Sequence, residues 1–461
     1  MYKHKITKTL TFILTFTIIL LLYPNTSAFA TSEKPPELNS EGVVVMNAET
    51  GQIIYGKNQD KQYYPASTTK ILTCLVVLDK VKNLEEKVTV GKNPPFADGT
   101  KIGIREGEIC TVNELLYGLI LESGNDCAEA LAEYVSGTKE EFAKLMNEYA
   151  KKLGATHSNF KNPSGLPDKE HYTTPTDLAL IMKELIKNQK FLDICSTKHL
   201  NYNKSNLDDY VRIVNNRNSI LDEASKYYYA PSFAAKKGYT IAAHFTNILA
   251  AKKNDMTLIV SNLCGDSIDT VYNDIKLILD YCFDNYEKTT AFHRNDEIGS
   301  FKIGNTDVPL VATEDINILH LKNTQMPKAT IDYTSPTSLD ENSYLKKGDI
   351  LTKGTLVIDG EKITETNLAS GIDKVADSDP KSSENENQDD SFSFLKLLKG
   401  CLYAILILAV LRIIYVQYRR AKKRKQKRNL KKLGDTKNIT LFFRLNSTYP
   451  LEALLLIQAL H

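Results

Sequence analysis

The sequence predicts an α+β protein of more than one domain. Two short strand-like runs within residues 42–55 and alternating apolar runs within 241–263 indicate strands, and the sequence between them is dominated by the 3.6-residue apolar spacing of helices. An α+β domain typically has this order, in which strands near its two ends flank a helical region in the middle. From about residue 287 the pattern changes to short alternating runs with turn residues, which predicts a separate all-β domain.

The first 30 residues have the pattern of a secretory signal peptide. Three lysines precede an apolar segment from Leu10 to Leu22, and the small-x-small sequence Ala28-Phe29-Ala30 follows. This order predicts cleavage after Ala30 and export of the rest of the chain. An uncleaved anchor is the alternative, but the apolar segment is short for a membrane span.

The first domain is predicted to occupy residues 31–286. Residues 42–47 and 52–55 predict two strands joined by a turn, and residues 241–250 and 256–263 predict a second hairpin. Helical spacing is found at 112–121, 128–135, 140–153 and 269–286, and a further helix is expected to start at 176–177.

Four segments follow the first domain. Residues 287–371 predict the small all-β domain, in which no catalytic residues are evident. Residues 372–399 are rich in Asp, Glu, Ser and Asn and predict an acidic disordered linker. The apolar residues 400–418 predict one C-terminal transmembrane helix. The basic residues that begin the tail, 419–461, belong on the cytoplasmic side of the membrane.

The charge distribution agrees with this topology. Residues from Arg412 onward contain 13 Lys or Arg and 2 Asp or Glu, whereas the rest of the chain contains 45 and 54. The formal net charge of +2 therefore combines an acidic exterior with a basic tail. The acidic exterior disfavours nucleic-acid binding, and the basic tail suits the anionic cytoplasmic membrane. The predicted location is the cell membrane, with a single span and residues 31–399 outside.

The stretch Pro65-Ala66-Ser67-Thr68-Thr69-Lys70 runs into an apolar helical sequence and contains a candidate nucleophile. Side chains three residues apart share a helix face, so the Lys70 amine can reach the Ser67 hydroxyl. A neutral lysine can act as the base that activates a serine. A helix start also offers unpaired N–H groups to a developing oxyanion. The alternative is a serine N-cap followed by a solvated lysine, because S-x-x-K alone is common.

Two further motifs follow in the chain order found in penicillin-binding proteins and class A β-lactamases. Ser123-Gly124-Asn125 lies between two helical patterns, and Lys236-Lys237-Gly238 opens a strand-like run, Tyr239 to Ala250. With these motifs the chain resembles the D-alanyl-D-alanine carboxypeptidases, the low-molecular-mass penicillin-binding proteins of the serine type. The segments most similar to sequences of this family are PASTTKILT, LLYGLILESGND, NPSGLPD and KKGYT.

The resemblance implies a penicillin-binding/β-lactamase-like transpeptidase domain that acts on peptidoglycan stem peptides ending in D-Ala-D-Ala. Ser67 would form an acyl-enzyme, Lys70 would be the general base, and Ser123 would relay a proton to the leaving amine. Penicillins and other β-lactams would acylate the same serine. No cofactor and no metal are implied.

The resemblance also implies a set of substrate-binding residues. Asn125 would hold the substrate amide and orient Lys70, and Lys236 would supply positive charge for the terminal carboxylate. The backbone N–H groups of Ser67 and Tyr239 would bind the oxyanion. The remaining residues assigned to substrate binding lie in the same segment: Lys237, Gly238 and Thr240.

Two positions depart from the family pattern. Lys237 stands where the K-T-G motif has a hydroxyl that binds the substrate carboxylate, and His244 stands where the family has a small glycine. We expect the Lys237 ammonium to face the cleft, to lower the pKa of its lysine neighbours and to make the enzyme a slow carboxypeptidase.

Two alternative functions share these motifs. A serine β-lactamase needs a base for deacylation, for which Glu170 is the candidate in its loop. The second alternative is a protein that binds penicillin or the cell wall but does not turn over substrate. The main observation that supports this alternative is Lys237. A zinc peptidase is excluded because the histidines lack zinc-ligand spacing: His157, His171, His199 and His244.

The seven cysteines show no disulfide framework, so buried free thiols are expected. One pair, Cys74 and Cys127, could lie close together below the site and form a disulfide.

Overall fold

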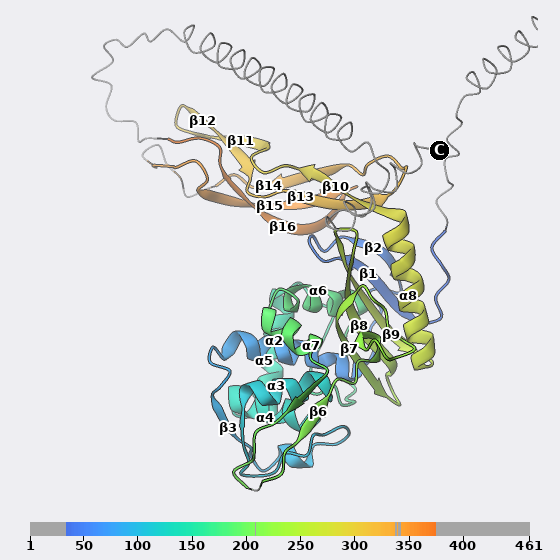
Figure 1. The fold of residues 1–461 in the computed structure, drawn as a ribbon. Coiled ribbons are helices and arrows are strands. Elements are labelled where there is room, and N and C mark those ends of the chain that lie inside the picture. Colours follow the sequence, from blue (N-terminus) through green and yellow to red (C-terminus); the bar gives the residue numbers. More distant parts are fainter. Residues whose placement is uncertain (1–33, 208, 337–338, 340–342, 375–461) are drawn as a thin grey trace, which may run out of the picture. The chain divides into compact units, whose positions relative to one another are not determined.

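The structure is a computed structural model that describes residues 34–207, 209–336, 339 and 343–374 (Figure 1). The predicted signal peptide, transmembrane helix and basic tail lie outside the described residues, as does the predicted linker after residue 374. Among the described residues, no helix has both the length and the apolar character needed to cross a membrane.

A five-stranded antiparallel sheet forms the centre of the first domain, with strand order β2-β1-β9-β8-β7. Its strands are β1 (Gly42–Asn47), β2 (Ile53–Lys57), β7 (Ser232–Thr240), β8 (His244–Lys253) and β9 (Met256–Gly265). Strands from both ends of the domain therefore meet in one sheet, and the predicted α+β architecture is confirmed.

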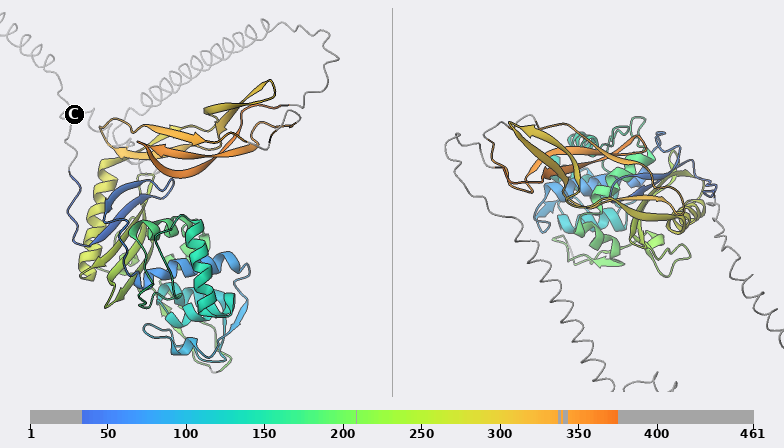
Figure 2. Two further views of the ribbon diagram at one scale, coloured as in Figure 1. Left: turned by 180° about the vertical axis from the view of Figure 1, so that it is seen from behind. Right: turned by 90° about the horizontal axis from the view of Figure 1, so that it is seen from above.

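The sheet separates two apolar cores, because successive side chains of a strand point to opposite faces. Val44 and Met46 of β1 pack into the core shared with the helical insert, whereas Val43 and Val45 pack into the core shared with α8 (Ile268–Asn285). Figure 2 shows α8 on one face of the sheet and the other helices on the opposite face. The Ser67 motif belongs to the helical side.

Within the residues that the structure describes, the helical insert contains six α-helices. They are α2 (Lys70–Lys80), α3 (Val112–Leu121), α4 (Asn125–Ser136), α5 (Lys139–Lys152), α6 (Pro175–Leu185) and α7 (Gln189–Ser196). Short strands and 3₁₀ turns connect them: η1 (Ala66–Thr69), β3 (Lys87–Thr89), η2 (Pro94–Phe96), β4 (Ile109–Thr111), β5 (His199–Asn201), β6 (Ile213–Asn215) and η3 (Ser219–Leu221).

Local capping fixes the ends of the helices nearest the site. The Thr111 hydroxyl accepts a hydrogen bond from the Glu114 backbone N–H, and the Glu114 carboxylate accepts one from the Thr111 backbone N–H. This capping box starts α3 where the sequence predicts it. Helix α4 ends at Gly137, whose φ of 79° lies in the left-handed region that favours glycine.

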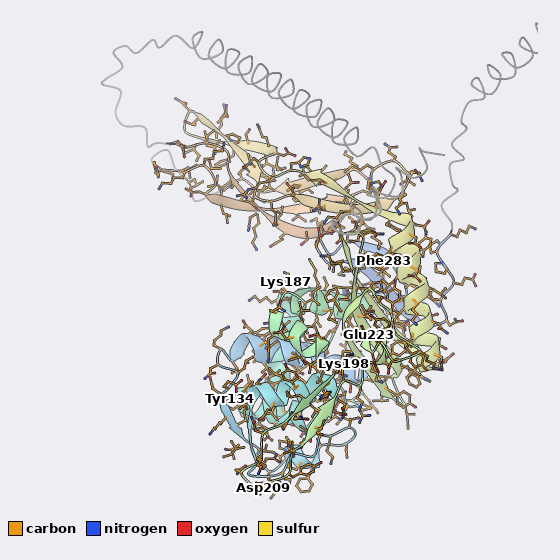
Figure 3. The ribbon with its side chains drawn as sticks, in the orientation of Figure 1. Tyr134, Lys187, Lys198, Asp209, Glu223 and Phe283 are labelled. Carbon is orange, nitrogen blue, oxygen red and sulfur yellow. The ribbon has the colours of Figure 1, made fainter. Side chains whose placement is uncertain are left out.

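Strand β7 is the last strand in the sheet order, and chain segments cover its outer edge. The Asn218 side chain accepts a hydrogen bond from the Lys237 backbone N–H at 3.2 Å. Lys198 and Glu223, labelled in Figure 3, form a 3.5 Å ion pair between two neighbouring segments. The Asn218 contact thus satisfies one outward N–H group of this edge strand, that of Lys237.

The second domain is all β. Strand β10 (Tyr286–Phe292) follows α8 directly and pairs with β13 (Ile316–Leu321). The other sheet has the order β11-β12-β16-β15-β14, and its strands are β11 (Glu297–Ile303), β12 (Thr306–Ala312), β14 (Ala329–Tyr333), β15 (Ile350–Ile358) and β16 (Glu361–Ser370). The predicted small all-β domain is confirmed.

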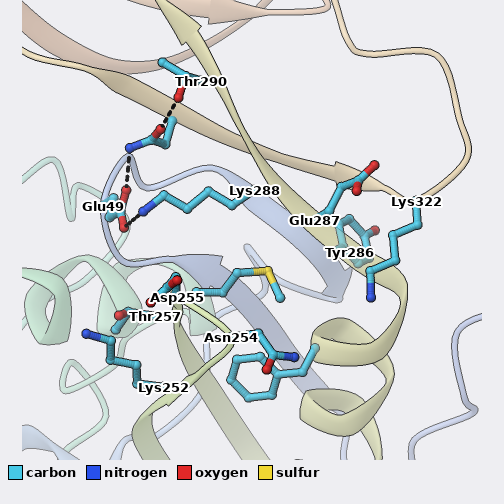
Figure 4. Close-up of a pocket in the computed structure, with 13 residues that line it drawn as sticks. Glu49, Lys252, Asn254, Asp255, Thr257, Tyr286, Glu287, Lys288, Thr290 and Lys322 are labelled. Carbon is cyan, nitrogen blue, oxygen red and sulfur yellow. Dashed lines mark hydrogen bonds and ion pairs between the residues drawn. The ribbon is translucent and has the colours of Figure 1, made fainter. Parts of the chain in front are cut away.

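Side chains of the β1–β2 turn contact the second domain. Gln52 exchanges two 2.8 Å hydrogen bonds with the backbone of Leu319. Glu49 accepts hydrogen bonds from Lys288 at 2.6 Å and Asn317 at 3.3 Å. A polar cavity of about 650 Å³ surrounds these residues (Figure 4). None of the predicted catalytic residues lines this cavity.

Two local predictions are wrong. Lys236 does not open a strand from Tyr239 to Ala250: the chain reverses after Thr240, whose hydroxyl accepts a hydrogen bond from the Ala243 backbone N–H. Apolar residues continue through this turn, and Ile241 is 88% exposed there, so the pattern conceals the reversal. The suggested disulfide is also absent, because Cys74 and Cys127 are buried free thiols.

Candidate active site

Ser67 lies in the 3₁₀ turn η1, directly before α2. The preceding residue, Ala66, has a φ of 49°, which costs a non-glycine residue about 1–2 kcal/mol. Gly165 packs against this turn so closely that a Cβ there would lie 1.8 Å from the Ala66 carbonyl oxygen. Packing from a neighbouring loop thus accompanies the strained backbone beside the candidate nucleophile.

The Lys70 side chain is fully buried and contacts three oxygens. Its Nζ lies 2.9 Å from Ser67 Oγ, 2.6 Å from Asn125 Oδ1 and 2.6 Å from the carbonyl oxygen of Ser164. Asn125, the first residue of α4, also donates to the carbonyl oxygen of Asp98 at 2.5 Å. The amine is therefore fixed from three sides, with Ser67 on one of them.

An ammonium can donate to all three oxygens, and a neutral amine can also occupy this position. Two N–H groups can donate to Asn125 and Ser164, which leaves the lone pair for the Ser67 hydroxyl proton. Burial holds the pKa of Lys70 well below its usual value, and the charge of Lys236 lowers that pKa further. The arrangement can take the proton from Ser67.

Ser123 and Lys236 form the second half of the site. Lys236 Nζ donates to Ser123 Oγ at 3.0 Å and to the carbonyl oxygen of Lys237 at 2.8 Å. Ser123 has a φ of 63°, a second left-handed non-glycine residue in the site. Lys236 is 1% exposed, and burial, followed by the charge of Lys237, lowers its pKa to about 7. Among the described residues, no carboxylate lies at ion-pair distance from Lys236 or Lys70.

Strand β7 passes against the backbone of Ser67. A Cβ on Gly238 would lie 2.6 Å from the Ser67 backbone nitrogen, so a larger residue does not fit without movement. The Lys237 N–H points away from β8, toward Asn218. Because strand N–H directions repeat every second residue, the Tyr239 N–H points the same way. The N–H groups of Ser67 and Tyr239 are thus the candidate donors for an oxyanion, on two segments that meet at Gly238.

Lys237, Tyr239 and Thr240, which follow Lys236 in β7, lie in different surroundings. Lys237 is half-buried, and its pKa is lowered by burial and by the charge of Arg217. Its Nζ makes no hydrogen bond or ion pair with the part of the chain that the structure describes. The Tyr239 ring is exposed and packs on Phe245 with centroids 4.5 Å apart. The Thr240 hydroxyl stabilises the β7–β8 turn.

Sequence reasoning missed Ser164 as a residue of the site. Its carbonyl oxygen contacts Lys70, and the Asn162 side chain shapes the loop by accepting hydrogen bonds from the backbone N–H groups of Ser164, Gly165 and Leu166. The sequence Asn162-Pro163-Ser164-Gly165 has turn chemistry. That signal could locate the turn, but not the carbonyl that faces the amine.

Two polar residues near this loop have structural contacts. His171 Nδ1 accepts from the Lys161 backbone N–H, so its Nε2–H donates to the Thr69 hydroxyl at 3.0 Å. Burial lowers the pKa of His171 to about 4. The Glu170 side chain is 71% exposed and pairs with Lys161 at 3.0 Å, so it offers no base to an acyl-enzyme on Ser67. Within the described ranges, no group of three or more His, Cys, Asp or Glu residues is placed to hold a metal ion.

Comparison with known proteins adds to this geometry. The family model described as D-alanyl-D-alanine carboxypeptidase matches residues 29–266, and the model of the penicillin-binding protein 5 C-terminal domain matches residues 286–374. D-alanyl-D-alanine carboxypeptidase DacF of Bacillus subtilis (strain 168) is 33% identical over 372 residues, which are 77% of this chain and 92% of that protein. D-alanyl-D-alanine carboxypeptidase DacC of Escherichia coli (strain K12) is 29% identical over 370 residues, 76% of this chain and 88% of that protein.

A solved structure agrees over both domains. Penicillin binding protein 5 from Haemophilus influenzae is similar with a TM-score of 0.59 and 28% identity, over 74% of this chain and 98% of that chain. The family match covers more than half of this chain and includes all three motifs. The chain therefore belongs to the D-alanyl-D-alanine carboxypeptidase family of serine peptidases.

Proposed function

We propose that this carboxypeptidase removes the terminal D-Ala from peptidoglycan stem peptides through an acyl-enzyme on Ser67. The observation that carries the proposal is the Lys70 amine, buried without a carboxylate partner among the described residues and 2.9 Å from Ser67 Oγ. A solvated lysine beside a serine N-cap would keep its proton and leave the serine unreactive.

Acylation uses the two halves of the site in turn. Lys70 takes the Ser67 proton while Oγ attacks the carbonyl between the two D-alanines. The backbone N–H groups of Ser67 and Tyr239 stabilise the oxyanion. As the peptide bond breaks, the proton passes from Lys70 through Ser123 to the leaving amine. Asn125 holds the Lys70 amine at 2.6 Å and faces the substrate amide.

Deacylation and recognition use the same groups. Lys70 deprotonates a water that attacks the ester, and Ser67 recovers its proton when the acid product leaves. Lys236 provides positive charge for the free carboxylate of the substrate, which distinguishes a chain end from an internal peptide bond. A β-lactam presents a similar carbonyl and carboxylate, so it acylates Ser67 as well.

Product analysis tests this function. The purified enzyme is incubated with a peptide ending in D-Ala-D-Ala and, separately, with a penicillin. We expect release of one D-Ala per peptide and slow turnover of the penicillin. Rapid hydrolysis of the penicillin without D-Ala release would instead indicate a β-lactamase, and binding without either product would indicate a turnover-deficient protein.

We also propose that both domains lie outside the cell, anchored by a single C-terminal span. The support is the order of sequence features: a signal-peptide pattern in 1–30, an acidic segment at 372–399, an apolar segment at 400–418 and basic residues after it. External protease on intact cells should cut the acidic segment and release a penicillin-binding fragment. Full protection of that segment from outside would contradict the orientation.

A further inference from the structure

We propose that Thr246 of β8 is a positioning residue for the oxyanion donor at Ser67. Its hydroxyl binds the carbonyl oxygen of Pro65 and so holds the turn that carries the Ser67 N–H group. The inference rests on the proposed function, because it concerns how the site stabilises the oxyanion formed in that reaction. It assigns Thr246 no contact with the substrate.

Thr246 lies next to the point where β7 passes the Ser67 turn. The pairing of β7 with β8 places Thr246 directly opposite Gly238. A Cβ on Gly238 would lie 2.6 Å from the Ser67 backbone nitrogen and 2.6 Å from Thr246 Oγ1. A glycine inside a strand is typical of a place where another backbone approaches closely. The Thr246 hydroxyl and the Ser67 N–H group therefore adjoin the same space beside Gly238.

Two hydroxyl groups hold the Pro65 carbonyl oxygen. The Thr246 side chain, which is fully buried, donates to this oxygen at 2.9 Å, and the Thr68 hydroxyl donates to it at 2.7 Å. Thr68 belongs to the turn itself, whereas Thr246 is 181 residues away from Pro65 and belongs to the sheet. The Thr246 hydrogen bond thus connects the turn to the sheet.

The turn needs this connection because its backbone is strained. Ala66, between Pro65 and Ser67, has a φ of 49°, and strained backbone persists only where its surroundings hold it. The Pro65 carbonyl belongs to the peptide group before Ala66, and the Ser67 N–H belongs to the peptide group after it. Rotation at Ala66 turns one group relative to the other, so a fixed carbonyl limits the directions that the N–H can take.

The connection also fixes the two candidate oxyanion donors relative to each other. The Ser67 N–H lies in the turn, and the Tyr239 N–H lies in β7, which is paired with the strand of Thr246. Oxyanion stabilisation depends on donors that are positioned before the reaction. Because the negative charge develops in the transition state, misplaced donors lower kcat more than they raise KM.

The test removes the hydroxyl and keeps the shape of the side chain. In Thr246→Val, we expect kcat for D-Ala release to fall roughly fivefold to tenfold, with KM within about twofold of the parent value. Thr246→Ser keeps a hydroxyl donor and should keep kcat within about twofold. The matched control is Thr366→Val in the second domain, where the Thr366 hydroxyl is buried without a hydrogen-bond partner in the described part of the chain. This control should keep the parent kcat and KM.

A second measurement separates positioning from stability. A peptide boronic acid forms a tetrahedral adduct with a catalytic serine and so resembles the transition state. Its dissociation constant does not depend on the fraction of the enzyme that is folded. The constant should rise roughly fivefold to tenfold in Thr246→Val, and it should stay near the parent value in Thr246→Ser and Thr366→Val.

An unchanged kcat and an unchanged affinity for the boronic acid in Thr246→Val would overturn the inference and leave the carboxypeptidase function standing. Equal losses in Thr246→Val and Thr246→Ser would also overturn it, because packing rather than the hydroxyl would then be responsible. No D-Ala release by the parent enzyme would overturn the proposed function. The boronic acid affinities, which require no turnover, would still decide the inference in that case.

Discussion

The proposed catalytic site around Ser67, here called the cleft, and the cavity between the two domains are both polar, but the charges of their lysines are compensated differently. In the cleft, Lys70 and Lys236 are buried, and no described carboxylate lies at ion-pair distance. In the domain cavity, Lys288 pairs with Glu49 at 2.6 Å, and both side chains remain partly exposed. The cleft thus contains uncompensated buried amines, whereas the domain cavity contains an ordinary ion pair.

This difference shows which polar cluster carries chemistry. A buried ammonium without a counterion is unfavourable, so the amine loses its proton more easily and can act as a base or respond to a substrate charge. An exposed ion pair contributes little energy and leaves its groups charged. The domain cavity has a volume of about 650 Å³, but its Lys288 is paired with Glu49 at 2.6 Å. The absence or presence of a counterion for each lysine is therefore a better indicator of the catalytic site here than the volume of a cavity.

The largest expected effect is on the buried amine of the cleft. Lys70→Ala should lower acylation by penicillin roughly 10³-fold, because Ser67 loses its general base. Lys70→Arg should fail as well, since a guanidinium keeps its proton. Stopped-flow acylation measures both variants. Lys288→Ala, in the domain cavity, is the matched control and should acylate at the parent rate; a similar loss there would remove the distinction between the two regions.

A second comparison uses two glycines, one in each domain. Gly238→Ala places a Cβ 2.6 Å from the Ser67 backbone nitrogen, so it should displace an oxyanion donor and lower kcat roughly 10²-fold. Gly354→Ala places a Cβ 2.3 Å from an Ile331 side-chain methyl in the β domain. It should destabilise that domain by about 1–3 kcal/mol without changing kcat. Thermal unfolding and D-Ala release, measured on both variants, separate the two outcomes.

The pH profile should report the coupled lysines of the cleft. Lys70 must be neutral, so kcat/KM rises with pH through its lowered pKa. Lys236 must be charged, so kcat/KM falls as pH rises past about 7 in the free enzyme. Lys237→Thr removes a nearby positive charge, raises the pKa of Lys236 and should move the alkaline limb up by about half a unit to one unit. An unchanged limb would show that Lys237 does not act on the site.

The smallest effect is expected in the domain cavity. Glu49→Gln removes the ion pair with Lys288 but leaves the Gln52–Leu319 hydrogen bonds. Unfolding free energy should fall by about 0.5 kcal/mol, with no change in kcat/KM. Chemical denaturation monitored alongside D-Ala release checks this. A tenfold loss of activity would show that the cavity takes part in catalysis.

Local features of the chain could be predicted from the sequence, whereas contacts between distant residues could not. The 3.6-residue spacing located α3, and a short apolar run next to a turn located β1, because these signals are local. Spacing placed Lys70 near Ser67 for the same reason. Asn125 Oδ1 and the Ser164 carbonyl oxygen reach that amine from 55 and 94 residues away. The family resemblance suggested the first of these contacts, whereas no sequence signal suggested the second.

Turns and long-range burial set the limits of prediction. No Gly or Pro marks the turn after Thr240, so the reversal before β8 was hidden. One strand was predicted across residues 239–250, where the structure has the end of β7, a turn and most of β8. Glu129 of α4 is only 6% exposed, and this burial depends on the tertiary structure rather than on the local helical pattern. A helical pattern shows only that Glu129 shares a face with Asn125.

The most direct measurement of the central claim is the site of a penicillin adduct. The purified protein is acylated with a labelled penicillin, digested and analysed by mass spectrometry, with Ser67→Ala alongside. The buried amine of Lys70, with its lowered pKa and its contact to Ser67 Oγ, predicts one adduct, on Ser67, and none in Ser67→Ala. An adduct on any other residue, or undiminished labelling of Ser67→Ala, would contradict the assignment of this cleft as the catalytic centre.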